Sequence, residues 1–151
     1  MKRLFTICAV LAIMLGTTKL WADSDSIIHF SQLPSTAQQL VKTHFPELGI
    51  TLIKMDTDFL DKSYSVIFDN GSKIDFNKNG EWEDIKSSQG VPQGVIPAKI
   101  FSYIKEKYPE AKVLSIEIDD DSKEYEVKLS NRVSLEFNKH QQLIDIDTDQ
   151  D

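Results

Sequence analysis

The sequence repeats itself, and this repeat limits the possible folds more than any other feature. Residues 64–85 align with residues 125–146 without a gap, and eight of the 22 positions are identical, where unrelated segments would share about one. Upstream the match continues with a shift of two residues, because Leu33-Pro34 aligns with Ile96-Pro97. Such length changes are tolerated in loops. The sequence therefore predicts two copies of one small unit, whose lengths differ between the first and second strands.

Each unit is expected to begin with a helix. Pro34 and Pro97 suit a first helical turn, where the missing N–H has no intrahelical partner to lose, and Pro46 and Pro109 would end the helix about a dozen residues later. Between the prolines, apolar residues recur at helical spacing and form an expected buried stripe. These residues are Ala37, Val41 and Phe45 in the first copy and Ile100, Ile104 and Tyr108 in the second.

After each helix the apolar period changes to two, which predicts four strands per unit. The expected strands include residues 53–55, 64–68, 74–76 and 81–86 in the first copy, and 116–118, 125–129, 135–137 and 141–147 in the second. Polar residues at alternate positions indicate an antiparallel sheet with one buried face and one solvent-exposed face. The predicted fold is α+β: a tandem duplication of a helix-plus-four-strand unit, with one extended antiparallel sheet and both helices packed on one face.

The turns differ between the copies. Asn70-Gly71 predicts a type I′ hairpin turn, because both residues accept a positive φ angle. The second copy has Arg132 in place of Gly71, and Gln141 in place of Gly80. We expect the turns of the second copy to be longer or more strained.

The N-terminus is typical of a secretory signal peptide. Lys2 and Arg3 precede an apolar run of about a dozen residues, too short to span a bilayer as a helix, and a small residue follows at Ala22. Leu20 is large for its position before the cut, so a retained anchor is the alternative. Cys8 lies within the run and is not read as a lipidation site. The expected organisation is a signal peptide (1–22), a first repeat (23–89), a linker (90–95) and a second repeat (96–151).

The charge of the mature chain limits its partners. All 24 acidic residues follow position 22, whereas Lys2, Arg3 and Lys19 would leave with the signal, so 14 basic residues remain and the net charge is −10. This charge repels nucleic acid and anionic membranes, and it fits an exported protein or one that meets a basic partner surface. Without a cysteine, the mature chain has no disulfide, thiol nucleophile or thiolate metal site. We expect a periplasmic or secreted protein with no membrane span after cleavage.

The repeated motifs resemble those of the PepSY-like family of exported proteins. Each copy has Leu/Ile-Pro near the helix start, Phe/Tyr-Pro at its end, Tyr-x-Val-x-Phe/Leu, and Ile/Leu-Asp/Glu-Phe-Asn. The resemblance covers about residues 27–147. It implies a fold similar to that of β-lactamase inhibitory protein, periplasmic residence, and protein binding or peptidase inhibition. It implies no catalytic motif, and Arg132 and Gln141 depart from its pattern.

No motif for catalysis or for a cofactor is present. A Gly-x-Ser-x-Gly elbow and a phosphate-binding glycine loop are both absent. His29, His44 and His140 have no metal-ligand spacing and are read as surface residues. The sequence therefore predicts no catalytic residue, cofactor or metal site, and not an enzyme. Carboxylate-based acid and base catalysis is the alternative, although most carboxylates lie on predicted outer faces.

Acidic turns are the basis of a second functional hypothesis. Asp56, Asp58 and Asp61 flank the first predicted hairpin, and the three aspartates of residues 119–121 form the equivalent turn. In residues 145–151, every second residue is an aspartate. Calcium takes such oxygen ligands, but the Gly and distal Glu of an EF-hand are missing, and carboxylates also serve simply to form turns. A small-ligand or calcium-binding protein is the alternative function.

Trp82, Phe59 and Leu60 are the candidate partner-binding residues. Counting by twos places Trp82 on the face opposite Ile85, where an indole could anchor a partner; the alternative is that it packs beneath the linker or the other unit. Phe59 and Leu60 lie in an acidic loop and would be a second exposed apolar contact. The alternative is that this loop folds back onto the sheet edge. The leading hypothesis is a non-enzymatic module that binds an unknown extracytoplasmic protein or peptide through its open sheet face. Inhibition of a peptidase or hydrolase is one form that this binding could take. The oligomeric state is left open.

Overall fold

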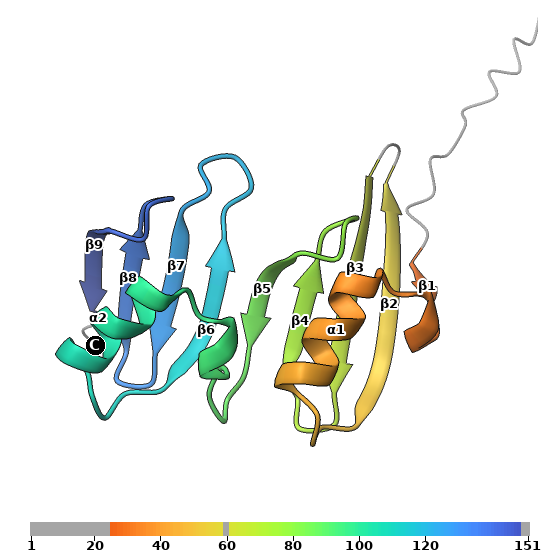
Figure 1. Cartoon of the computed structure of the whole chain (residues 1–151), viewed down its shortest axis with the longest axis horizontal. Coiled ribbons are helices and arrows are strands. Elements are labelled where there is room, and N and C mark those ends of the chain that lie inside the picture. The colour runs from red at the N-terminus through yellow and green to blue at the C-terminus, as the bar shows by residue number, and fades with distance from the viewer. Residues whose placement is uncertain (1–24, 59–60, 149–151) are drawn as a thin grey trace, which may run out of the picture.

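The computed structural model describes residues 25–58 and 61–148 of the chain. These residues form one antiparallel sheet of nine strands, and the strands lie side by side in the order of the sequence (Figure 1). The expected α+β class with a single extended antiparallel sheet is therefore confirmed. The predicted signal peptide, its cleavage site, and Phe59 and Leu60 lie outside the described residues.

Each half of the chain contains a helix followed by four strands. The first half comprises β1 (Ser26–Ile27), a 3-10 turn (Phe30–Gln32), α1 (Ser35–His44), β2 (Ile50–Asp58), β3 (Asp61–Phe68), β4 (Lys73–Phe76) and β5 (Trp82–Lys86). The second half comprises a 3-10 turn (Gln93–Val95), α2 (Ala98–Lys107), β6 (Val113–Ile118), β7 (Tyr125–Leu129), β8 (Val133–Phe137) and β9 (Leu143–Thr148). The periodicity identified both helices and eight strands, but it missed the two-residue strand β1. Both helices begin one residue after the proline, which occupies the N-cap position.

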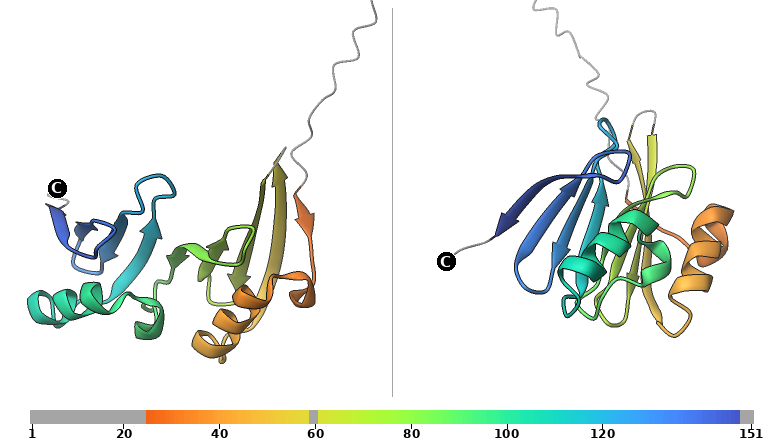
Figure 2. Two further views of the ribbon diagram at one scale, coloured as in Figure 1. Left: turned by 45° about the horizontal axis from the view of Figure 1, so that its top comes forward. Right: turned by 60° about the vertical axis from the view of Figure 1, so that its left-hand side comes forward.

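The core lies between the sheet and its two helices. Figure 2 shows α1 and α2 on the same side of the sheet, so the opposite face is open. In the inner strands, alternate residues such as Val66, Ile74, Leu135 and Phe137 point toward the helices and are at most 1% exposed. The predicted helical stripes are buried except at Tyr108, which is half-buried.

The two halves share this core at the junction of β5 and β6. Ile85 and Ile116 are paired across these strands, and both are fully buried. The predicted linker is packed rather than loose, because Val91 and Val95 are buried and the Val91 N–H donates to the Val113 carbonyl at 2.7 Å. The sheet is therefore continuous through the boundary between the halves.

The hairpin turns differ from the predicted type I′ geometry, and those of the second half are strained rather than longer. Gly71 has φ +81° but Asn70 has a negative φ, so this is not a type I′ turn. Instead, the Gly71 N–H donates to the Phe68 carbonyl and Ser72 closes a three-residue loop, the pattern of a type I turn followed by a left-handed residue. Arg132 (φ +64°) and Gln141 (φ +62°) occupy the same conformation as Gly71 and Gly80. The second-copy turns are therefore not longer, but they hold side chains in a conformation that favours glycine.

Candidate functional site

One row of side chains on the open face consists largely of carboxylates. Buried neighbours along the strands, such as Ile85 next to Asp84 and Ile116 next to Glu117, point toward the helices, so the row points away from the core. Each member lies directly opposite the next on the neighbouring strand, where strands are about 4.8 Å apart. From β4 to β9 the row contains Asp75, Asp84, Glu117, Glu126, Glu136 and Asp145.

Lysines compensate only half of this acidic row. Lys73, Lys86 and Lys128 lie two residues along their own strands from Asp75, Asp84 and Glu126, and each forms an ion pair with that carboxylate. The ion pair raises the pKa of Lys86, first through its hydrogen bond to Asp84. No salt bridge involves Glu117, Glu136 or Asp145 in the part of the chain that the structure describes.

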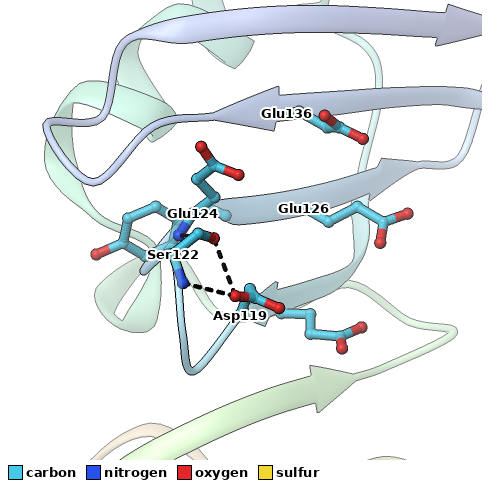
Figure 3. Close-up of a pocket in the computed structure, with 7 residues that line it drawn as sticks. Asp119, Ser122, Glu124, Glu126 and Glu136 are labelled. Carbon is cyan, nitrogen blue, oxygen red and sulfur yellow. Dashed lines mark hydrogen bonds between the residues drawn. The ribbon is translucent and has the colours of Figure 1, made fainter.

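Two of these three carboxylates, Glu117 and Glu136, border an acidic groove on the second half of the sheet. It has a volume of about 270 Å³ and is lined by Glu117, Asp119, Ser122, Glu124, Tyr125, Glu126 and Glu136. Figure 3 shows Glu126 and Glu136 projecting from neighbouring strands, with Glu124 and Asp119 at the end nearer the β6–β7 turn. The groove therefore presents five carboxylates to solvent and suits a cationic partner.

A second hollow opens where β5 and β6 separate. Their ladder contains three pairs and ends at Asp84 and Glu117. Beyond this point, the hollow on the helix side has a volume of about 460 Å³. It is lined by Thr36, Leu40, Asn77, Gly80, Glu81, Trp82, Glu83, Ile118, Asp120, Lys123 and Tyr125. We call this hollow the junction cleft, since strands of both halves form it.

Trp82 lies in the junction cleft and not on the open face. The register of β4 and β5 shifts between Asp75 and Phe76, so Glu83 forms a bulge and Trp82 pairs with Phe76. The indole is half-buried and packs against the core. The prediction that Trp82 faces away from Ile85 was wrong, because a bulge changes which face the following residue points to.

The carboxyl groups of Glu83 and Asp120 meet at the rim of the cleft. Burial is the largest cause of a raised Glu83 pKa, and the negative charge and hydrogen bond of Asp120 raise it further. Asp120 also accepts a hydrogen bond from the Lys123 ammonium at 3.1 Å. Both carboxyl groups also border a hollow of about 330 Å³ that continues toward Asp75, Asp84 and Glu117. The junction cleft and the acidic row are therefore connected around the end of the β5–β6 ladder.

The acidic turn before β7 is organised by its own hydrogen bonds. Asp119 Oδ1 accepts from the Ser122 N–H at 2.7 Å, from the Ser122 hydroxyl at 2.9 Å and from the Asp121 N–H at 3.0 Å, and the Ser122 bonds are the main cause of its lowered pKa. Within residues 25–58 and 61–148, no three His, Cys, Asp or Glu side chains converge as metal ligands.

Sequence reasoning singled out Trp82 and the turn of residues 119–121, and the structure brings Trp82 and Asp120 of that turn to one cleft. It missed the acidic row. A sequence pattern that could have predicted the row is an acidic residue between two apolar residues, which recurs in successive strands. Examples are Ile116-Glu117-Ile118, Tyr125-Glu126-Val127 and Leu135-Glu136-Phe137. Phe59 and Leu60 remain predictions.

A family model described as "Putative beta-lactamase-inhibitor-like, PepSY-like" matches residues 62–145, which is more than half of the chain. The chain belongs to the PepSY-like family. The resemblance expected from the motifs is thus confirmed. No match was found among curated proteins.

Three solved structures of Bacteroides proteins share the fold of this PepSY-like chain. One, described as a putative periplasmic protein of the DUF2874 family from Bacteroides vulgatus, is 46% identical with a TM-score of 0.78, and the match covers 84% of this chain and 99% of that one. A second, described as a putative calcium-regulated periplasmic protein from Bacteroides thetaiotaomicron, is 49% identical with a TM-score of 0.77 and coverage of 82% and 97%. A third, a putative periplasmic protein of unknown function from Bacteroides vulgatus, is 28% identical with a TM-score of 0.74 and coverage of 82% and 99%.

All three relatives are described as periplasmic, which agrees with the predicted periplasmic or secreted location of this PepSY-like protein. None of the helices in the described part of the chain is long and apolar enough to cross a membrane.

Proposed function

We propose that this protein is a non-enzymatic binding module that engages a basic protein or peptide through the open face of its sheet. The observation that carries the proposal is the acidic row, in which Glu117, Glu136 and Asp145 form no ion pair with any lysine of the described residues. Like charges directly opposite each other destabilise a sheet by about 0.2–1 kcal/mol per pair. A row of this kind lowers stability unless a cationic surface lies on it. Binding of a basic partner is therefore the role that best accounts for it.

The family description favours inhibition as the form of this binding. The matching model is described as β-lactamase-inhibitor-like, and an inhibitor needs a surface that covers an enzyme rather than catalytic groups of its own. A hydrolase or peptidase with a basic surface around its substrate entrance is the partner that fits both the family and the acidic face. Charge complementarity of this kind raises the association rate and selects the partner.

The matching turns and bulges of the two halves support a tandem duplication. The register shifts between Asp75 and Phe76 in the first half and between Glu136 and Phe137 in the second, at equivalent positions of the repeat. The β2–β3 and β6–β7 ladders also share a shift near their starts. A duplication lengthens the sheet without a new fold, and it provides a face long enough for a protein partner.

The proposal is tested by neutralising the groove. The mature chain, residues 23–151, is immobilised and used to capture proteins from an envelope extract of the native host at low and at 0.5 M salt. The test variant carries Glu117→Gln, Glu126→Gln and Glu136→Gln. The matched control carries Glu47→Gln, Glu106→Gln and Glu110→Gln, which remove the same charge from exposed positions at the helix ends.

We expect one basic protein to be retained by the wild type and by the control, and to be lost from the groove variant and at high salt. Inhibition is then measured directly as loss of that protein's hydrolytic activity. Equal capture by all three baits would refute binding through the acidic face.

Calcium binding is the second candidate, because one relative is described as calcium-regulated. The described residues contain no convergent set of three ligands, so we expect at most weak association with the acidic face. Isothermal titration of the mature chain tests this, and the absence of heat at millimolar calcium would exclude the candidate.

A further inference from the structure

The junction cleft combines an apolar floor with an acidic rim. Four half-buried side chains line it, namely Leu40 of α1, Trp82 of β5, Ile118 of β6 and Tyr125 of β7. All of them except Ile118 pack against the core. Glu81, Glu83 and Asp120 lie at its edge, and Lys123 is the only cation among the residues that line it. A floor of this kind binds an aliphatic or planar group, and a rim of this kind binds a positive charge.

The two halves differ at the positions that build this cleft. Trp82, Glu81 and Glu83 of the first copy correspond to Leu143, Gln142 and Ile144 of the second. In the first copy these residues lie on or next to β5, whose neighbour is β6 of the second half. In the second copy they lie on or next to β9, which is the last strand of the described sheet. The aromatic ring and both carboxylates therefore occur where two units meet, and the equivalent positions without a following unit carry neither.

We propose that the junction cleft binds an arginine side chain of the basic partner, with the guanidinium between Glu83 and Asp120 and its plane against Trp82. This inference rests on the proposed function and names the group of the partner that would be anchored.

The carboxyl pair explains why a cation is the fitting occupant. Glu83 and Asp120 both line the cleft and are close enough to hydrogen-bond, and the charge of Asp120 disfavours ionisation of Glu83. Without a ligand, the Lys123 ammonium contacts the Asp120 carboxylate at 3.1 Å and offsets part of this negative charge. Since Lys123 is 60% exposed, its ammonium can be displaced at low cost, which leaves both carboxylates for an incoming cation.

Arginine fits better than lysine because of its shape. A guanidinium is planar, stacks on an aromatic ring, and presents five donors that can serve two carboxylates at once. An ammonium is a compact, strongly hydrated charge that loses more on entering a partly apolar site. The connected hollow toward Asp84 and Glu117 gives the rest of a basic peptide a path onto the acidic row.

The cleft has a built-in reporter. The chain contains two tryptophans, and Trp21 precedes the predicted cleavage site, so Trp82 is the only one in residues 23–151. The mature protein is titrated with capped hexa-arginine, hexalysine and hexacitrulline peptides at low salt. Trp82 emission reports occupancy of the cleft, and the anisotropy of fluorescein-labelled peptide reports binding anywhere on the protein. The cleft variant carries Glu83→Gln and Asp120→Asn, and its matched control carries Glu47→Gln and Glu110→Gln.

We expect hexa-arginine to change Trp82 emission with saturation, hexalysine to bind with a smaller emission change, and hexacitrulline to have no effect. Loss of two charge-assisted hydrogen bonds weakens the emission-monitored affinity of the cleft variant by about tenfold or more. Peptide that binds by anisotropy without changing Trp82 emission, or an equal response to hexalysine, would overturn the arginine site while leaving the acidic face intact. No anisotropy change with either cationic peptide would count against both proposals.

Discussion

Replacing Gly80 by alanine should destabilise the protein far more than the same replacement at Gly71. Both residues have nearly the same positive φ, +79° and +81°, so both replacements incur the left-handed strain of a residue with a Cβ atom, about 1 kcal/mol. A Cβ at Gly71 would meet no atom within 4 Å. A Cβ at Gly80 would lie 2.7 Å from Pro34 Cβ and 3.0 Å from the Ala37 amide nitrogen.

The contact at Gly80 is with the first turn of α1, which cannot turn aside as a flexible side chain would. Overpacking of this kind costs about 1–3 kcal/mol, so the predicted loss is about 2–4 kcal/mol at Gly80 and about 1 kcal/mol at Gly71. The assay is urea unfolding of the two variants and the wild type, followed by far-UV circular dichroism, with the free energy of unfolding extrapolated to water. Equal losses at the two sites would refute the reasoning that close approach of α1, rather than the backbone angle, requires Gly80.

Three further outcomes follow from the buried groups and the junction. Ser72→Ala should cost about 1–3 kcal/mol in urea unfolding, because the Ser72 hydroxyl bonds that of buried Ser87 at 3.0 Å; the double alanine variant should lose less than the sum of the single ones. Burial and Asp120 raise the pKa of Glu83 in the folded protein, so ionisation of Glu83 disfavours folding. Glu83→Gln should therefore stabilise the folded protein at neutral pH, and this gain should vanish as the pH falls below about 4.5. Melting temperatures of the variant and the wild type across this pH range test it. Ile116→Ala, at a fully buried position of the junction, should cost about 2–5 kcal/mol and lower one shared calorimetric transition; two separate transitions would contradict a common core.

Periodicity was sufficient for both helices and for strands β2 to β9 because the core positions are regular. Val66 and Phe68 in β3, and Leu135 and Phe137 in β8, alternate with polar residues and are buried as predicted. The two-residue length difference also falls where the repeat predicts it. The β2–β3 hairpin runs to Asp58 and Asp61, whereas residues 119–124 connect β6 to β7.

The candidate site was harder to predict because it depends on pairing between the two halves of the chain. The register that brings Glu117 opposite Asp84 joins residues more than thirty positions apart, and no local pattern sets it. The cleft likewise arises because the β5–β6 ladder ends at this pair. The net charge fitted either an exported protein or one that meets a basic partner surface, and the alignment of the carboxylates could be found only from the sheet register.

Trp82 shows which local signal was available and how it should be read. Counting by twos assumes a regular strand, and on that assumption Trp82 and Ile85 face opposite ways. Both copies, however, carry a large apolar residue three positions before an isoleucine in their fourth strand, as Trp82 precedes Ile85 and Leu143 precedes Ile146. Both pairs face the helices, because a bulge adds one residue between their members. An apolar spacing of three that recurs at the same place in two copies of a strand therefore indicates a bulge, and here that bulge moves the indole from the open face into the cleft between the units.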